Sequence, residues 1–261
     1  MRYPTVFQPC RIGGLTLKNR LAMSQMTMNY ATEDGMVTDK LIAYYRERAK
    51  GGVGLIFVEG TSFTPEGRGY VRQIGIASQA HVEGLKRLTD AVHGLKNGTK
   101  IFLQIHHAGG RASSKITGIQ PVAPSAIPPY AGAETPRALM REEIEDLIEA
   151  HVEAAARAKE AGFDGVDIHC AHGYLVPSFF SPMTNQRTDE YGGDLACRTR
   201  FLLEIIRGIR KRLGREYPLT IKISGDEYIE GGLGIKEMIA IARLAQEAGI
   251  DGLIVSAGTV G

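Results

Sequence analysis

Short apolar runs alternate with longer stretches of helical periodicity along the chain. The predicted strands are almost continuously apolar, as expected for parallel strands buried on both faces, and they lie at Leu21–Met26, Val53–Glu59, Lys100–His106, Gly165–His169, Leu219–Ser224 and Gly252–Ser256. The predicted amphipathic helices lie between them, at Asp39–Lys50, Gln79–Lys96, Arg141–Ala161, Leu195–Leu213 and Ile235–Ala248. This alternation predicts an α/β fold, either an open doubly wound sheet or a closed barrel.

A repeated motif favours the barrel. Ala-Gly-(Phe/Ile)-Asp-Gly occurs at 161–165 and again at 248–252, which indicates one unit repeated around an axis. A (β/α)8 TIM barrel has eight strands, and the pattern accounts for about six of the eight β/α units. We therefore expect residues 1–261 to form a single TIM-barrel domain that is truncated before strands 7 and 8.

Composition narrows the setting and the partners. Apolar residues make up 43% of the chain and charged residues 23%, a composition typical of a soluble globular protein. The net charge of +2 gives no reason to expect nucleic acid or a membrane as partner. Cys10, Cys170 and Cys197 form no CxxC pair, which argues against a structural zinc or a disulfide framework. The N-terminus lacks the apolar segment of a signal peptide. We expect a cytoplasmic protein that acts on a small molecule, with a homo-oligomer left open.

Two loops are longer than usual connections, at 107–140 and 171–194. Both follow predicted strands, so both lie at the C-terminal face of a barrel, where the active sites of this fold are built. We interpret them as substrate walls or lids.

The second loop opens with the residues best suited to catalysis. His169 ends a predicted strand, and His172 must already lie in the loop if both imidazoles are to face one pocket, which Gly173 makes easy. Tyr174 then points the same way if the backbone is extended. Two imidazoles can donate hydrogen bonds to a carbonyl oxygen, and a tyrosine can deliver a proton. The alternative is a packed, hydrogen-bonded aromatic cluster.

A metal site is a second alternative for this segment. His169 and His172, with Cys170 between them, could supply ligands to a metal-dependent TIM-barrel hydrolase. The segment is strand-to-loop rather than an HExxH helix, however, and no third ligand has helpful spacing. We therefore predict no metal.

Polar residues inside two other apolar strands also need explanation. Gln104 and His106 share one face of their strand, and a primary amide can pair with a heterocycle that has donor and acceptor edges. Satisfied polar groups in the core are the alternative. Lys222 is a charge within an apolar strand and needs a partner, either an anionic cofactor edge or a carboxylate such as Asp167.

Weaker signals come from the ends of the first two strands. Ser24, Met26 and Thr27 end the first strand, and Gly60 follows the second, where it would let a planar group approach the backbone. His81, His93 and His151 fall on predicted helices, and we interpret them as structural or solvated.

Together these motifs resemble the Old Yellow Enzyme family of NADH:flavin oxidoreductases. The resemblance covers essentially the whole chain and is closest to the bacterial branch of 2,4-dienoyl-CoA and 2-enoate reductases. It is carried by LKNRLAMSQMTMN, GLIFVEGTSFTPEGR, IFLQIHHAGGR, VAPSAIP, AAARAKEAGFDGVDIHCAHGYL, FFSPMTNQRTDEYGGDLACRTRFL and IKIS. The resemblance implies a (β/α)8 barrel with FMN at its C-terminal face and NAD(P)H as reductant.

The resemblance also implies roles for individual residues. Ser24, Met26 and Thr27 would line the flavin, Gly60 would contact its ring, Gln104 would bond its pyrimidine edge and Lys222 would stabilise its anionic reduced form. His169 and His172 would bind the substrate carbonyl, with Tyr174 as the catalytic proton donor. The implied reaction passes hydride from NAD(P)H through the flavin to an activated C=C bond of an α,β-unsaturated carbonyl or enoate.

This sequence departs from the family pattern at several places. Gln25 stands where proline is usual, and Ala108-Gly109-Gly110-Arg111 has one glycine more than the common motif. The loops that hold the FMN phosphate follow strands 7 and 8, and the cysteines of the iron–sulfur cluster found in larger members are not encoded. An inactive barrel fragment is therefore a further alternative.

Overall fold

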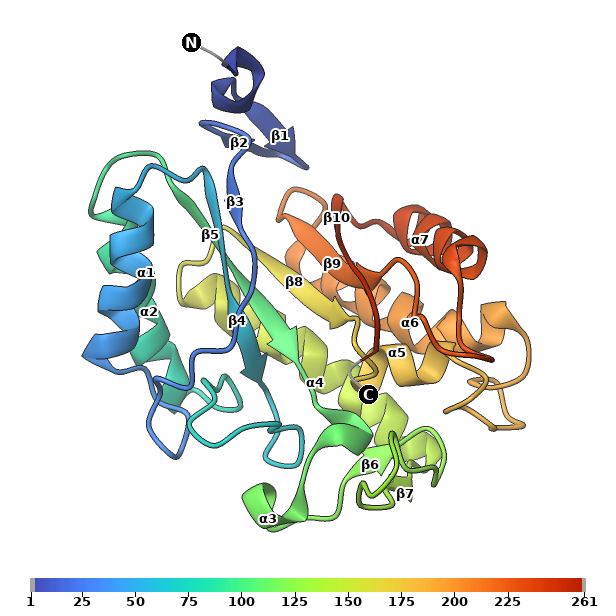
Figure 1. Ribbon diagram of the computed structural model, residues 1–261. Helices are drawn as coiled ribbons and strands as arrows, with labels where there is room; N and C mark the ends of the chain where they lie inside the picture. Colours follow the sequence, from blue (N-terminus) through green and yellow to red (C-terminus); the bar gives the residue numbers. More distant parts are fainter. Residues whose placement is uncertain (1–2, 260–261) are drawn as a thin grey trace.

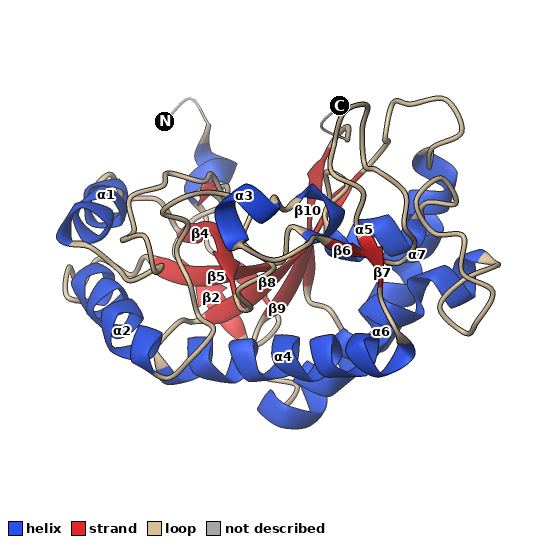
Figure 2. Ribbon diagram, turned by 90° about the horizontal axis from the view of Figure 1, so that it is seen from below, coloured by secondary structure: helices blue, strands red, loops and turns tan. Residues whose placement is uncertain are grey.

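Six parallel strands form a curved sheet, and the main helices lie along its convex side (Figures 1 and 2). The computed structural model describes residues 3–259. The strands are β1 (Cys10–Ile12), β2 (Leu15–Leu17), β3 (Ala22–Met23), β4 (Leu55–Ser62), β5 (Lys100–His106), β6 (Val122–Ala123), β7 (Arg137–Ala138), β8 (Gly165–Cys170), β9 (Leu219–Ser224) and β10 (Gly252–Ser256). The helices are α1 (Asp39–Lys50), α2 (Ala80–His93), α3 (Ser114–Thr117), α4 (Arg141–Glu160), α5 (Leu175–Phe180), α6 (Leu195–Leu213) and α7 (Ile235–Ala248), with 3-10 turns η1 (Pro4–Phe7) and η2 (Gly109–Arg111).

The sheet follows chain order from β3 through β4, β5, β8 and β9 to β10, and each neighbouring pair is parallel. One long helix lies between each pair of successive strands, so the predicted β/α alternation is confirmed. Within residues 3–259, β3 and β10 do not pair with each other. The six strands therefore form a curled half-barrel (Figure 2).

The first two strands differ from their predicted bounds. β3 has only two residues, because its ladder with β4 ends after Met23 pairs with Ile56. The next residues leave the ladder, and the Met28 amide donates to the buried Glu59 carboxylate at 2.8 Å. β4 continues to Ser62, beyond the predicted end, through a bulge between Val58 and Gly60.

The repeated motif forms two equivalent turns. Asp164 accepts from the Ile101 amide at the start of β5, and Asp251 accepts from the Leu219 amide at the start of β9, both at 2.9 Å. In return, the backbone amide of Asp164 donates to the Ile101 carbonyl at 2.9 Å, and that of Asp251 donates to the Leu219 carbonyl at 2.7 Å. Cations then neutralise each carboxylate, Lys100 beside Asp164 and Arg210 beside Asp251. The repeat is thus a structural unit that joins neighbouring strands.

An antiparallel hairpin of β1 and β2 covers the amino ends of the strands, and the periodicity did not predict it. Its Leu17 belongs to a small apolar cluster with Leu55, Phe57 and Phe102, and Ile254 of β10 packs against that cluster. The main core lies instead between the sheet and the long helices. The hairpin therefore contacts both early and late strands of the sheet.

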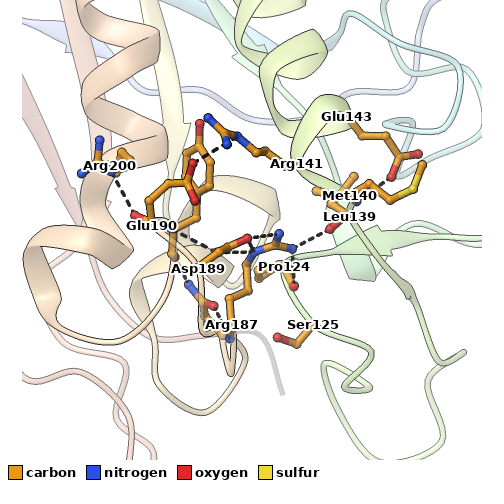
Figure 3. Close-up of polar contacts among 12 residues, drawn as sticks. Pro124, Ser125, Leu139, Met140, Arg141, Glu143, Arg187, Asp189, Glu190 and Arg200 are labelled. Carbon is orange, nitrogen blue, oxygen red and sulfur yellow. Dashed lines mark hydrogen bonds and ion pairs between the residues drawn. The ribbon is translucent and has the colours of Figure 1, made fainter.

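The two long loops are partly ordered by secondary structure and tied together by one arginine. The first contains η2, α3 and the parallel pair β6–β7, and the second contains α5. Figure 3 shows Arg187 between them: its guanidinium donates to the carbonyls of Pro124 and Leu139 at 3.1 and 2.5 Å and pairs with Asp189. The Arg187 side chain is only 11% exposed, so these bonds are largely shielded from water.

None of the helices within residues 3–259 has the length and apolar character needed to cross a bilayer.

Candidate functional site

The carboxyl ends of the strands surround a cavity of about 130 Å³. Its lining residues are Gln25, Thr27, Gly60, Tyr70, Gln104, His106, His169, His172, Tyr174 and Lys222. Most of the residues selected from the sequence therefore meet in one place. Ser24 and Met26 do not line the cavity.

The end of β8 places the two predicted histidines side by side. β8 ends at Cys170, and His172 and Gly173 both adopt left-handed backbone conformations, with φ of 65° and 69°. The rings of His169 and His172 lie 5.3 Å apart, centroid to centroid. The condition of an extended backbone from His172 to Tyr174 is not met, because two successive left-handed residues turn the chain and Tyr174 becomes the residue before α5; Tyr174 nevertheless lines the cavity. Its ring still packs edge-on against His169 at 4.9 Å.

Burial keeps these imidazoles neutral. Burial, with Lys222 and Arg111 nearby, lowers the pKa of His172 to about 4. Burial next to other histidines lowers the pKa of His106 to about 3, and burial also holds the pKa of His169 well below its ordinary value. The Ala171 amide donates to Nδ1 of His169 at 3.3 Å, so the proton of the neutral ring is on Nε2. His169 can therefore donate one hydrogen bond without carrying charge.

Tyr174 keeps its proton and has a hydroxyl partner. Burial and the neighbouring Tyr70 hydroxyl, 2.8 Å away, raise the pKa of Tyr174. Arg111 lies near the same ring, with its guanidinium carbon 5.9 Å from the centroid. Tyr70 comes from the loop after β4 and is 38% exposed. The phenol thus remains an intact proton donor at neutral pH.

Gln104 lines the buried side of the cavity, and Asp167 lies behind it. Gln104 donates from Nε2 to Asp167 at 2.8 Å, and Gln25 donates to the same carboxylate oxygen at 2.6 Å. Burial raises the pKa of Asp167 to about 6, although these bonds and Thr220 oppose the shift. Lys222 makes no ion pair with Asp167 or any other group in residues 3–259. Its ammonium therefore faces a cavity without an anionic partner, and burial lowers its pKa.

The residues after β3 and the bulge in β4 shape the opposite wall. Ser24 donates to the Gln25 side chain at 3.0 Å, whereas the Met26 side chain is 60% exposed. A Cβ on Gly60 would meet the His106 ring at 3.1 Å. A side chain at position 60 would therefore crowd the His106 ring, and the contact of Gly60 with a planar ligand stays a prediction.

The described residues provide no set of ligands for the metal site considered as an alternative. No group of three or more His, Cys, Asp or Glu side chains in the described part of the chain could hold a metal ion. Cys170 is fully buried, and burial raises the pKa of its thiol. The helical histidines are structural as expected: His93 pairs with Asp164 at 2.8 Å, and His151 bonds the Leu147 carbonyl at 2.6 Å.

Three lining residues were not among the predicted site residues. His106 had a signal, because it shares a strand face with Gln104, and both of its ring nitrogens are buried without a partner in residues 3–259. Gln25 had a weaker signal, as an amide within an apolar run. Tyr70 had none, because a loop residue acquires neighbours only through the fold.

Known proteins have sequences similar to this one. Residues 5–260 match the profile of the NADH:flavin oxidoreductase / NADH oxidase family, whose members use FMN with NAD(P)H as reductant. An NADH oxidase of Thermoanaerobacter brockii is 46% identical over 98% of this chain and 39% of its own length. The chain thus spans about two fifths of that relative.

Two solved structures extend the comparison. A 2-naphthoyl-CoA reductase in complex with 2-naphthoyl-CoA superposes with a TM-score of 0.95 at 37% identity, over 98% of this chain and 41% of its own. An Old Yellow Enzyme homologue from Zymomonas mobilis has a TM-score of 0.88 at 36% identity, over 97% of this chain and 73% of its own. From the profile, the relatives and the shared barrel architecture, the chain belongs to the NADH:flavin oxidoreductase / NADH oxidase family, the Old Yellow Enzymes.

Proposed function

We propose that this chain binds FMN at the carboxyl-end cavity and reduces an activated C=C bond, in an α,β-unsaturated carbonyl or enoate, with hydride from NAD(P)H. The observation that carries the proposal is the meeting of two neutral imidazoles, an intact phenol and an unpaired ammonium around one cavity. These groups match the needs of a substrate that must be held by its oxygen and protonated on carbon.

The cavity fits a heterocyclic, partly anionic group. Gln104 has its carbonyl oxygen left for a ligand after donating to Asp167, and Lys222 offers a cation on the neighbouring side. We propose that Gln104, Lys222 and Thr27 hold the ring, with Ser24, Met26 and Gly60 beside it. When bound, FMN supplies the hydride-transferring centre, which no amino-acid side chain provides.

The side chains of the chain then hold and protonate the substrate. The Nε2–H of His169 donates to the substrate carbonyl oxygen. His172, whose ring centroid lies 5.3 Å from that of His169, supplies a second contact. Neutral imidazoles polarise a carbonyl through hydrogen bonds without giving up a proton. Tyr174 holds its proton on Oη until it is delivered to the α-carbon.

The proposal is tested with the purified chain. We expect it to bind added FMN, with a visible absorbance that NAD(P)H bleaches anaerobically and an α,β-unsaturated ketone or enoate restores. A chain that retains no flavin absorbance after unbound FMN has been removed contradicts the proposal. Bleaching that no activated alkene reverses would contradict only the substrate class. Cytoplasmic location, a single domain over residues 1–261 and homo-oligomer formation stay predictions from the sequence.

A further inference from the structure

A buried carboxylate lies behind Gln104, outside the lining of the cavity, with polar partners on three neighbouring elements. Asp167 has no exposed surface, and its Oδ2 accepts from Nε2 of Gln25 at 2.6 Å and from Nε2 of Gln104 at 2.8 Å. Its Oδ1 accepts from the Thr220 hydroxyl at 2.7 Å. A carboxylate buried this deeply is tolerated only when such donors replace its lost hydration.

Strand register builds this arrangement. Gln104 on β5 pairs with Asp167 on β8, and Asp167 pairs with Thr220 on β9. The three residues therefore form one row across the sheet, on the same face. Lys222 lies two residues beyond Thr220, so it shares that face one layer nearer the cavity mouth.

The row determines which end of the Gln104 amide faces the ligand. A primary amide has an NH₂ donor and a carbonyl acceptor, whereas an ionised carboxylate only accepts. The reversed amide would place its oxygen against Asp167 Oδ2, so the NH₂ group must point to the carboxylate. Since Gln104 lines the cavity, its side-chain oxygen is then the atom that faces a bound ligand.

We propose that Asp167 is a positioning residue, which fixes the Gln104 amide so that its oxygen accepts an N–H from the bound heterocycle. The inference rests on the proposed function, since FMN is the heterocycle. Gln25 occupies the second donor place on Asp167 Oδ2 and keeps that oxygen oriented toward Gln104. Asp167 acts through Gln104 and is not among the residues that line the cavity.

Two substitutions of Asp167 separate its hydrogen bonding from its charge. Asp167→Asn removes the charge and keeps one oxygen that can accept from both glutamines. Asp167→Leu has similar size and no acceptor, so it frees both amides. Dissociation constants for FMN, from quenching of flavin fluorescence, should stay within about threefold of the unaltered chain for Asn and rise about tenfold or more for Leu.

A double-mutant cycle tests whether the effect passes through Gln104. Gln104→Ala should weaken FMN binding in the unaltered chain and cause little further loss in the Asp167→Leu background. Far-ultraviolet circular dichroism and thermal unfolding establish that each variant is folded. Equal losses for Asn and Leu, no loss for Leu, or additive losses in the cycle would each overturn the proposal.

A second pair of variants decides the matter if Asp167→Leu does not fold. Gln104→Glu keeps acceptor oxygens but has no NH₂ group for Asp167, so we expect it to bind FMN as weakly as Gln104→Ala. Binding by Gln104→Glu at the strength of the unaltered chain overturns the inference. An unaltered chain that binds no FMN overturns the proposed function and this inference together, whereas normal FMN binding by the Leu variant overturns the inference alone.

Discussion

At the scale of single residues, the main chemical property of the carboxyl-end cavity is the neutral charge of its imidazoles. His106, His169 and His172 all have lowered pKa values because they are buried next to one another or to cationic groups. Their rings therefore remain neutral hydrogen-bonding groups over the whole neutral pH range. Among the described residues that line the cavity, Lys222 is the buried cation; burial lowers its pKa, and the nearby Asp167 carboxylate opposes that shift.

His172→Ala should weaken the binding of a phenol to the FMN-loaded protein by about tenfold, because one hydrogen-bond partner of the phenolate oxygen is lost. Affinity for FMN should change by less than about twofold. The charge-transfer absorbance of the phenol complex measures the first quantity and fluorescence titration the second.

Ser256→Ala is the control for this change. The Ser256 hydroxyl bonds Nε2 of His172 at 2.7 Å without lining the cavity, so its loss should cause a smaller defect. If FMN affinity fell in parallel with phenol affinity in His172→Ala, His172 would belong to the cofactor site.

Tyr174→Phe should slow the reduction of an activated alkene about a hundredfold and leave NAD(P)H oxidation nearly unchanged, because it removes the proton and keeps the ring packed on His106 and His169. Stopped-flow measurement of each half-reaction separates the two rates. Tyr70→Phe is the matched control, since it removes only the partner hydroxyl. Equal slowing of both half-reactions would show that Tyr174 is not the proton donor.

Strand alternation predicted most of this site, and backbone turns limited the rest. The positions of Gln104, His169 and Lys222 follow from strand periodicity, because parallel strands end at one edge of the sheet. The positions of His172 and Tyr174 in the cavity depend on left-handed backbone conformations at His172 and Gly173. Only the glycine indicated such a conformation in the sequence. The partner of Lys222 was left open between Asp167 and a cofactor edge, and the structure shows no ion pair with Asp167.

At the scale of elements, Arg187 connects the two long loops through bonds to carbonyls that lie 63 and 48 residues earlier in the sequence. Its planar guanidinium bonds two carbonyls of the first loop and a carboxylate of the second at the same time. Lysine cannot reproduce that geometry, because its ammonium is a point charge without the planar fork. The position of α5 next to β6 depends on the same loops, which contact each other there.

Arg187→Lys should therefore loosen both loops and lower the free energy of unfolding by about 1–3 kcal/mol. Hydrogen exchange followed by mass spectrometry should show faster exchange within 120–140 and 180–192 and no change in the central strands. Arg46→Lys on the exposed face of α1 is the control. Unchanged exchange in both loops of Arg187→Lys would mean that other contacts order them.

The regular elements could be predicted from the sequence, whereas the short ones could not. β5, β8, β9 and the long helices have strong periodicity and were predicted within a few residues. β3 was overextended because residues 24–26 look like strand, although the ladder with β4 ends at Met23; the Gln25 side chain then bonds Asp167, and the Met28 amide bonds Glu59. The β1–β2 hairpin and the parallel pair β6–β7 have two or three residues per strand, too few for a periodic signal.

At the scale of the whole molecule, buried neutral histidines couple stability to pH. His151 lies between the rings of Phe63 and Phe201, and burial lowers its pKa to about 3. The unfolded chain binds a proton at this residue below about pH 6.5 and the folded chain does not. Its contribution to stability is therefore fully present above pH 6.5 and is lost as the pH falls from there toward 3.

His151→Leu should flatten this dependence. Between pH 7.5 and 5 the variant should lose about 2 kcal/mol less of its unfolding free energy than the unaltered chain, at about 1.4 kcal/mol per pH unit below 6.5. Denaturant titrations at the two pH values measure it. His81→Leu, at the partly exposed start of α2, is the control, and an equal slope in His151→Leu and the unaltered chain would refute the explanation.

The β1–β2 hairpin has a consequence for the order of folding events. Leu17 and its neighbours in the hairpin contact β4 and β5, and Ile254 of β10 completes the same cluster, more than 230 residues further along the chain. Closing so long a loop has a large entropic penalty, and a growing chain cannot complete the cluster before β10 has been synthesised. Side-chain packing between β4 and the long helices involves much shorter separations. We therefore expect the apolar cluster beneath the hairpin to be completed late, once β10 has joined the sheet.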